Sequence, residues 1–155
     1  MADLSGLSLA IELATKNRDV CQGRLAVAKR TVHQDQDQLS QLQAYASDKD
    51  TRWIQAGATL FSGELVKHHY QFMDRLQHAM VQQSGVIQGS ELAVGKAAAT
   101  LLESEIRLAG LKEILQLRLR AKDALQKKRE QKQTDEFASQ QYARKRAEYE
   151  RGEYL

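Results

Sequence analysis

The fold is decided by residues 11–56, which read IELATKNRDVCQGRLAVAKRTVHQDQDQLSQLQAYASDKDTRWIQA. Apolar side chains recur in this stretch at intervals that alternate between three and four residues, without a slip. This repeat is typical of the seam along which one helix packs against another in a coiled coil. The seam positions are Ile11, Ala14, Arg18, Cys21, Leu25, Ala28, Val32, Asp35, Leu39, Leu42, Ala46, Lys49, Trp53 and Ala56, of which Arg18, Asp35 and Lys49 are polar. The stretch therefore predicts one long helix that packs along a single line.

A second seam with the same spacing follows in the other half of the chain. Its positions are Met73, Leu76, Met80, Gln83, Ile87, Ser90, Val94, Ala97, Leu101, Ser104, Leu108, Leu111, Leu115, Arg118, Lys122 and Leu125. Between the two seams, Gly57 and Gly63 bracket five residues, with Ser62 placed to cap a helix N-terminus and Glu64 in its first turn. The sequence predicts helices over about 5–57 and 63–148, joined by a turn at 58–62.

A connection this short forces the two helices to lie antiparallel. Pairing outward from the turn joins residues whose numbers sum to about 119. The N-terminal end of the first helix should therefore lie opposite about residue 115 of the second helix. The remainder of the second helix should overhang alone and fray, because a lone helix is held mainly by propensity. The same register places Asp35 opposite Gln83, and a polar layer of this kind typically fixes register. The predicted fold is all-α: a single domain over 1–155 that forms an antiparallel two-helix coiled coil, or long helical hairpin.

Composition agrees with this fold. The 155 residues include no proline, and only 6% of them are aromatic, which suits long uninterrupted helices and a narrow seam better than a compact globular core. A weaker apolar line at Leu9, Leu13, Val20 and Val27 widens the face of the first helix. Gly85, Gly89, Gly95 and Gly110 each cost about 1 kcal/mol relative to alanine, so the second helix is expected to bend near them.

Nothing in the sequence predicts catalysis, a cofactor or a metal site. No phosphate-binding glycine loop, dinucleotide fingerprint or nucleophile elbow is present. The histidines, His33, His68, His69 and His78, are spaced so that they cannot share one ion, and they are expected on the polar surface. Cys21 is the single cysteine, which favours a reducing compartment and a buried thiol. The chain is therefore expected not to be an enzyme.

Neither a membrane span nor a secretion signal is expected. No stretch approaches the roughly 20 apolar residues of a span, and residues 1–6 lack a basic and an apolar region. The formal net charge of +3 permits nucleic acid or anionic membrane as a partner but does not indicate either. A soluble, cytoplasmic protein is predicted.

Two surface features exceed what folding requires. Near the turn, Phe72 and Ala79 flank the seam residue Leu76, and Tyr45 lies beside Leu42. This additional apolar row is explained equally well by a partner and by coverage of the seam edge. Farther along, seven basic residues stand against Asp123 and Glu130, a net charge of +5: Arg118, Arg120, Lys122, Lys127, Lys128, Arg129 and Lys132. This basic overhang (118–132) fits either a solvated helix face or a docking segment for an acidic protein.

Three segments resemble the FliJ family, the small coiled-coil proteins of the flagellar type III export apparatus. Tyr70-Gln-Phe-Met-Asp-Arg-Leu-Gln-His-Ala79, with Gln82-Gln83 after it, is similar to the start of that family's second helix. Gln38-Leu-Ser-Gln-Leu-Gln-Ala-Tyr45 is similar to the end of its first helix. Asp135-Glu-Phe-Ala138, followed by Ala143-Arg-Lys145, is similar to its C-terminal signature. The resemblance covers nearly the whole chain in order and spacing.

The resemblance implies a cytoplasmic stalk at the inner-membrane export apparatus. Its partners would be the hexameric export ATPase with its regulator, the membrane gate protein FlhA, and export chaperones. The open end of the hairpin, with its basic overhang, would enter the ATPase ring. The gate-binding surface would consist of Gln38, Leu42, Tyr45, Phe72, Leu76 and Ala79, with Lys49 where the family often has an aromatic residue.

Two other classes of protein fit the pattern. A stalk protein of an injectisome type III system would share the same fold, and a generic coiled-coil adaptor or nucleoid-type protein would share the repeat. Nucleic-acid binding is the less favoured of these, because the basic overhang contains no aromatic residue on which a base could stack.

Overall fold

The structure is a computed structural model that describes residues 2–57 and 62–152. Those residues form two helices, α1 (Ala2–Ala56) and α2 (Gly63–Gly152), and include no strand. The all-α hairpin predicted from the seams is confirmed. α1 begins slightly before its predicted start, and α2 ends slightly after its predicted end. Residues 58–61, the middle of the predicted turn, lie outside the described residues.

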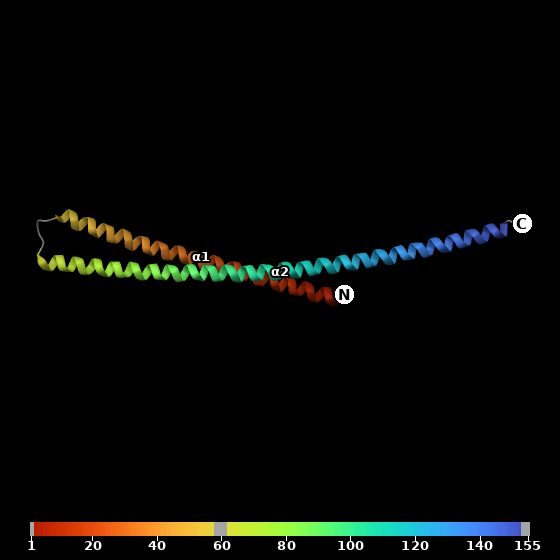
Figure 1. Ribbon diagram of the computed structural model, residues 1–155, viewed down its shortest axis with the longest axis horizontal. Helices are drawn as coiled ribbons and strands as arrows, with labels where there is room; N and C mark the ends of the chain where they lie inside the picture. The colour runs from red at the N-terminus through yellow and green to blue at the C-terminus, as the bar shows by residue number, and fades with distance from the viewer. Residues whose placement is uncertain (1, 58–61, 153–155) are drawn as a thin grey trace. The chain divides into compact units, whose positions relative to one another are not determined.

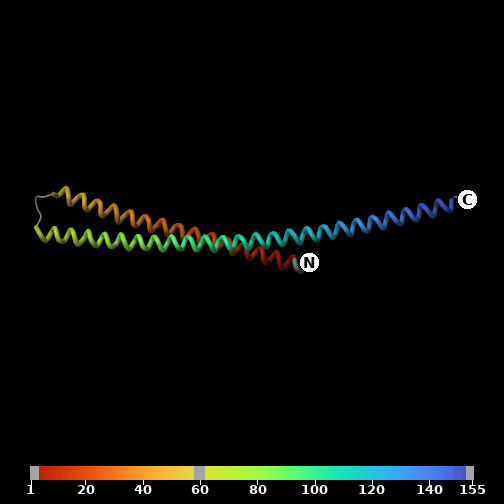
Figure 2. Tube along the Cα trace, in the orientation of Figure 1, coloured from red at the N-terminus to blue at the C-terminus, as the bar shows by residue number. Residues whose placement is uncertain are grey.

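The chain divides into two compact units, one of Leu13–Leu108 and one of Met1–Glu12 with Ala109–Leu155. Within the Leu13–Leu108 unit, α1 and α2 run side by side in opposite directions (Figure 1; Figure 2 traces the same pairing). The rings of Trp53 and His69 stack near the turn, and Gln83 contacts Asp35 farther along. These two contacts place the helices in the predicted antiparallel register.

The seam of this unit is narrow and built largely from small side chains. Between Ala14 and Trp53, every predicted seam position of α1 is buried or half-buried, and the same holds for α2 from Met73 to Leu108. The most buried residues are Ala14, Cys21, Ala46, Leu76, Ser104 and Leu108. Small residues at the contact let the two helices approach closely, so little bulk is needed to exclude water from the seam.

Three polar seam residues of α2 are hydrogen-bonded within the unit. Gln83 Nε2 donates one hydrogen bond to the Asp35 carbonyl oxygen at 2.9 Å and another to Gln38 Oε1 at 3.2 Å. The hydroxyls of Ser90 and Ser104 donate to carbonyl oxygens of their own helix. Gln83 therefore forms the predicted polar layer with Asp35, although it uses the backbone of Asp35 and not its carboxylate.

The two helix ends at the turn have the predicted capping chemistry. Gly57 adopts a left-handed backbone with φ of 42°, which is the common way to end a helix and is strained for residues with a Cβ atom. Ser62 Oγ accepts a hydrogen bond from the Leu65 amide at 3.3 Å, as an N-cap residue does. Glu64 lies in the first turn of α2, where its charge complements the helix dipole.

Two Gly→Ala substitutions, one within α1 and one directly after its end, are expected to change stability in opposite directions. Gly57→Ala should lower the free energy of unfolding by about 1 kcal/mol, because its φ is positive. Gly23→Ala should raise it by about 1 kcal/mol, because Gly23 is in the helix interior and an added Cβ meets nothing within 4 Å. Chemical denaturation of both variants measures the difference. Equal shifts of the same sign would contradict the assigned helix end.

The other unit contains the predicted overhang. Leu4, Leu7 and Ile11 of α1 are half-buried, as are Leu111 and Leu115 of α2. From residue 116 to residue 146 every residue of α2 is exposed, while the helix continues to Gly152. The predicted end of pairing near residue 115 is therefore confirmed.

Three details of the predicted apolar pattern are wrong. Ala56, a predicted seam position at the end of α1, is exposed. Leu125 was expected to continue the seam but is 52% exposed, because α1 has no residues left to pair with it. The line at Leu9, Leu13, Val20 and Val27 does not add to the buried face, since its members are 51–57% exposed. These four side chains stay largely open to solvent, because the seam needs only one line of contacts.

Candidate partner-binding surfaces

His69 corrects the expectation that all four histidines lie on the polar surface. Its side chain is only 12% exposed, and its ring stacks on Trp53 with centroids 4.0 Å apart and planes 2° from parallel. Its Nε2 also lies 3.9 Å from Asp50 Oδ1. Counting four residues back from Met73 extends the α2 seam to His69. The heptad repeat therefore predicts that His69 is buried, which its polar type obscures.

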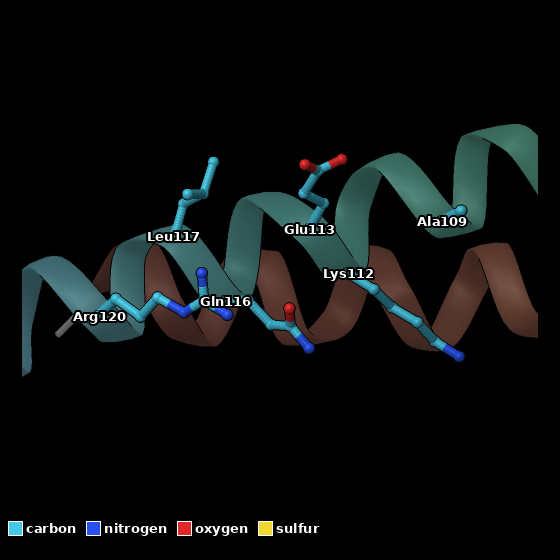
Figure 3. A pocket seen from close by; sticks show the side chains of 6 residues that line it. All are labelled: Ala109, Lys112, Glu113, Gln116, Leu117 and Arg120. Carbon is cyan, nitrogen blue, oxygen red and sulfur yellow. The ribbon is translucent and has the colours of Figure 1, made fainter.

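The described residues carry most of their ionisable side chains along open helix surfaces. They include no group of three His, Cys, Asp or Glu side chains that could hold a metal ion. The hollows in the described surface are open. One of them, at the start of the exposed part of α2, is lined by Ala109, Lys112, Glu113, Gln116, Leu117 and Arg120. There Glu113 and Leu117 project to one side of the helix, and Lys112, Gln116 and Arg120 project to the other (Figure 3). Such a surface can bind another protein but cannot enclose a small substrate.

Neither described helix has a stretch apolar enough and long enough to cross a membrane.

The six residues predicted to bind the gate all belong to the Leu13–Leu108 unit, and we call them the turn-proximal patch: Gln38, Leu42, Tyr45, Phe72, Leu76 and Ala79. Its centre is an aromatic pair. The rings of Tyr45 and Phe72 meet edge to face with centroids 6.1 Å apart, although the two residues belong to different helices. Tyr45 remains 46% exposed and Phe72 38% exposed. The pair thus covers the seam edge and also presents aromatic surface to the outside.

The other members of the patch differ in how much surface they offer. Gln38 is exposed and tied to Gln83 by its hydrogen bond, while Leu42 and Ala79 are half-buried. Leu76 is only 8% exposed and belongs to the core of the seam. At the edge of the patch, the Lys49 ammonium lies 5.5 Å from the centre of the Tyr45 ring, a distance that permits a cation–π contact. Lys49 therefore adds positive charge where another aromatic ring could have stood.

The seven basic residues of the basic overhang are all exposed on α2. Lys127 pairs with Asp123 at 3.3 Å, one helical turn away. For the other six, the described part of the chain supplies no ion pair. The net charge of +5 is therefore largely available to a partner, and exposed charges of one sign attract complementary surfaces and speed association.

Comparison with known families finds a match that runs along nearly the whole chain. The model of the flagellar FliJ protein family matches residues 5–147, which include both seams, the turn-proximal patch and the basic overhang. Comparisons with curated proteins and with solved structures find no significant match. Since the family match covers nearly the whole chain, this protein belongs to the FliJ family of flagellar export.

Proposed function

We propose that this protein is a cytoplasmic stalk and chaperone-escort component of flagellar protein export, held peripherally at the inner-membrane export apparatus. Its proposed partners are the export ATPase ring with its regulator, the membrane gate protein and the export chaperones. It acts by binding, without catalysis or a cofactor. The observation that carries the proposal is the family match over residues 5–147, because it includes both surfaces that folding leaves free.

The turn-proximal patch is the proposed gate-binding site. Tyr45 and Phe72 supply exposed aromatic area that is already ordered by their mutual contact, so little side-chain entropy is lost on binding. Aromatic residues of this kind commonly dominate the energy of protein interfaces. Gln38, fixed by Gln83, adds a polar group at the rim. Leu42, Leu76 and Ala79 are half-buried or buried and offer less surface to a partner.

The basic overhang is the proposed ATPase-binding site. Its residues have no helix packed against them, and most of their charge is unpaired within the described chain. A ring lined with acidic side chains would be complementary to it. The segment contains no aromatic residue, which argues against single-stranded nucleic acid as the ligand.

A charge introduced into the aromatic pair is expected to weaken gate binding selectively. Phe72→Glu should reduce capture of the gate protein about tenfold or more, because it replaces an exposed aromatic contact with a charge. Tyr70→Glu is the matched control, since Tyr70 lies on the same helix outside the patch and is 67% exposed. Tagged protein would be used to capture partners from the native cytoplasm and membranes, with circular dichroism confirming equal helix content.

The same capture experiment tests the proposed function as a whole. The wild-type chain should recover the flagellar export ATPase and the gate protein. Recovery of an injectisome ATPase in their place would assign the protein to that system. If neither ATPase is recovered, the stalk function is wrong.

A further inference from the structure

A second heptad repeat runs along the outer face of α2, within the Leu13–Leu108 unit. Its positions alternate in spacing between four and three residues: Val81, Gly85, Gln88, Leu92, Gly95, Ala99, Leu102 and Ile106. We call this set the outer row. At about 100° per residue it lies roughly 150° around the helix from the seam, so it cannot contact α1. Its large members are well exposed: Val81 62%, Leu92 69%, Leu102 57% and Ile106 63%.

The outer row includes three small residues, Gly85, Gly95 and Ala99, among its large side chains. An open groove on this face is lined by Gln88, Glu91, Leu92, Gly95, Lys96 and Ala99. A Cβ atom added at Gly95 would meet nothing within 4 Å, so the fold of the chain does not require glycine there. Glycine in a helix interior is destabilising relative to alanine. The presence of Gly95 is explained if an apolar side chain from another molecule enters the groove beside it.

We propose that the outer row is a self-association surface, on which a second copy of this chain packs its α2 antiparallel to the first. The arrangement has a two-fold axis that passes between residues 100 and 101. Ile106 of each copy then lies over Gly95 of the other, and Leu102 of each copy lies opposite Ala99 of the other. By symmetry each large–small contact occurs twice. Every large side chain in these layers meets a gap, which is what a close-packed antiparallel pair of helices needs.

The charges that flank the outer row select the same register. With the axis between residues 100 and 101, Lys96 of each copy lies beside Glu103 of the other, giving two ion pairs across the interface. In the described part of the chain, neither of these side chains has an ion-pair partner of its own. The same alignment therefore pairs opposite charges beside the outer row and sets its large side chains against small residues.

Alignments shifted by one heptad lose both kinds of complementarity. Sliding the copies by one heptad in one direction sets Leu92 against Leu102 and Glu91 beside Glu105. Sliding them in the other direction sets Ile106 against Leu102 and places Glu103 beside its own equivalent. A parallel pair would place Gly95 opposite Gly95 and leave a void. Like charges and mismatched volumes disfavour the two shifted alignments, and the void disfavours the parallel pair.

The predicted dimer is weak. With the axis between residues 100 and 101, the outer-row residues that face one another are those from 95 to 106. This is roughly 17 Å of helix, and a single seam of this length buries far less than the roughly 1,600 Å² of a standard stable interface. We therefore expect association that depends on protein concentration. Gly95, Lys96 and Glu103 lie outside the turn-proximal patch and the basic overhang, so the dimer does not rest on the proposed export function.

Sedimentation equilibrium of the full chain tests the surface. The wild type should show a monomer–dimer equilibrium, and Gly95→Gln should raise its dissociation constant about tenfold or more by filling the groove. Gly23→Gln is the matched control, because Gly23 is an equally open helix glycine on α1. Both variants should keep or raise the thermal midpoint, since each removes a helix glycine. A monomeric wild type, or a dimer that Gly95→Gln leaves unchanged, would overturn the proposal.

A charge exchange tests the pairing of Lys96 with Glu103. Lys96→Glu alone should weaken association about tenfold, because two attractive contacts become repulsive. Adding Glu103→Lys to the same chain should restore it, since both ion pairs are re-formed with reversed sign. If the double variant associates no better than Lys96→Glu, the two residues do not meet and the antiparallel register is wrong.

Disulfide trapping tests the direction of the helices. In a Cys21→Ala background, a chain with Ala99→Cys mixed with a chain with Leu102→Cys should form the mixed disulfide, since only that pair lies in one layer. A parallel dimer would instead give disulfides between two Ala99→Cys chains. Predominance of that product would overturn the proposed arrangement.

Discussion

A chain truncated after Leu115 is expected to fold as a shortened hairpin that binds the gate but no longer stimulates the export ATPase. The truncation removes the basic overhang, whose residues are all exposed, and leaves every described contact of the Leu13–Leu108 unit in place. We expect loss of most of the stimulation, because the charge that would meet the ring is gone. ATP turnover and gate capture, measured on the same preparation, decide the outcome.

A full-length control separates charge from length. Changing Lys127, Lys128 and Arg129 to Gln keeps helix propensity while removing three positive charges from the overhang. If charge matters, this variant should lose part of the stimulation, and the loss should shrink at high salt, where exposed charges are screened. Undiminished stimulation by the truncated chain would show that the overhang is only a solvated helix. Loss of both activities together with helix content would show that it stabilises the hairpin.

Leu76→Glu is expected to unfold much of the Leu13–Leu108 unit, whereas Phe72→Glu should leave it folded. Leu76 is 8% exposed in the seam, so a carboxylate there loses water without gaining a partner. We expect its free energy of unfolding to fall by about 3 kcal/mol or more. Phe72 is 38% exposed and can turn a charge toward solvent, so its loss should be about 1 kcal/mol. Denaturation followed by circular dichroism measures both.

The contrast between these two residues also decides which variants can report on gate binding. A change at Leu76 would abolish binding by unfolding the surface, and its effect would say nothing about contact with the gate. A Phe72→Ala variant that melts the hairpin would place Phe72 in the core and remove the centre of the proposed patch. Gate binding is therefore best probed at Tyr45 and Phe72.

The seams could be predicted from the sequence because a coiled coil repeats one local rule along its whole length. The alternation of three and four residues predicted which side chains are buried from Ala14 to Trp53 and from Met73 to Leu108. The turn glycines fixed the pairing register well enough to place Gln83 beside Asp35. The end of pairing near Leu115 followed from chain length alone.

What the sequence could not supply was the exposure of each side chain at the seam edge. Apolar type alone does not distinguish Leu76, which is buried, from Phe72, which is partly open, because both positions lie close to the seam. The same limit applies to Leu13, Val20 and Val27, which are exposed although they are apolar. His69 shows the opposite error: its polar type suggested the surface, yet stacking on Trp53 holds it in the seam.

Cys21 makes the opening of the hairpin directly measurable. Its side chain is 4% exposed and lies in the seam of the part of α1 far from the turn. An alkylating reagent can reach this sulfur only when the two helices separate there, so the rate of thiol modification reports how often that separation occurs. Because the chain has no other thiol, modification of the wild-type protein reports the separation of the helices at this one position. A bound partner that holds the helices together would slow the reaction.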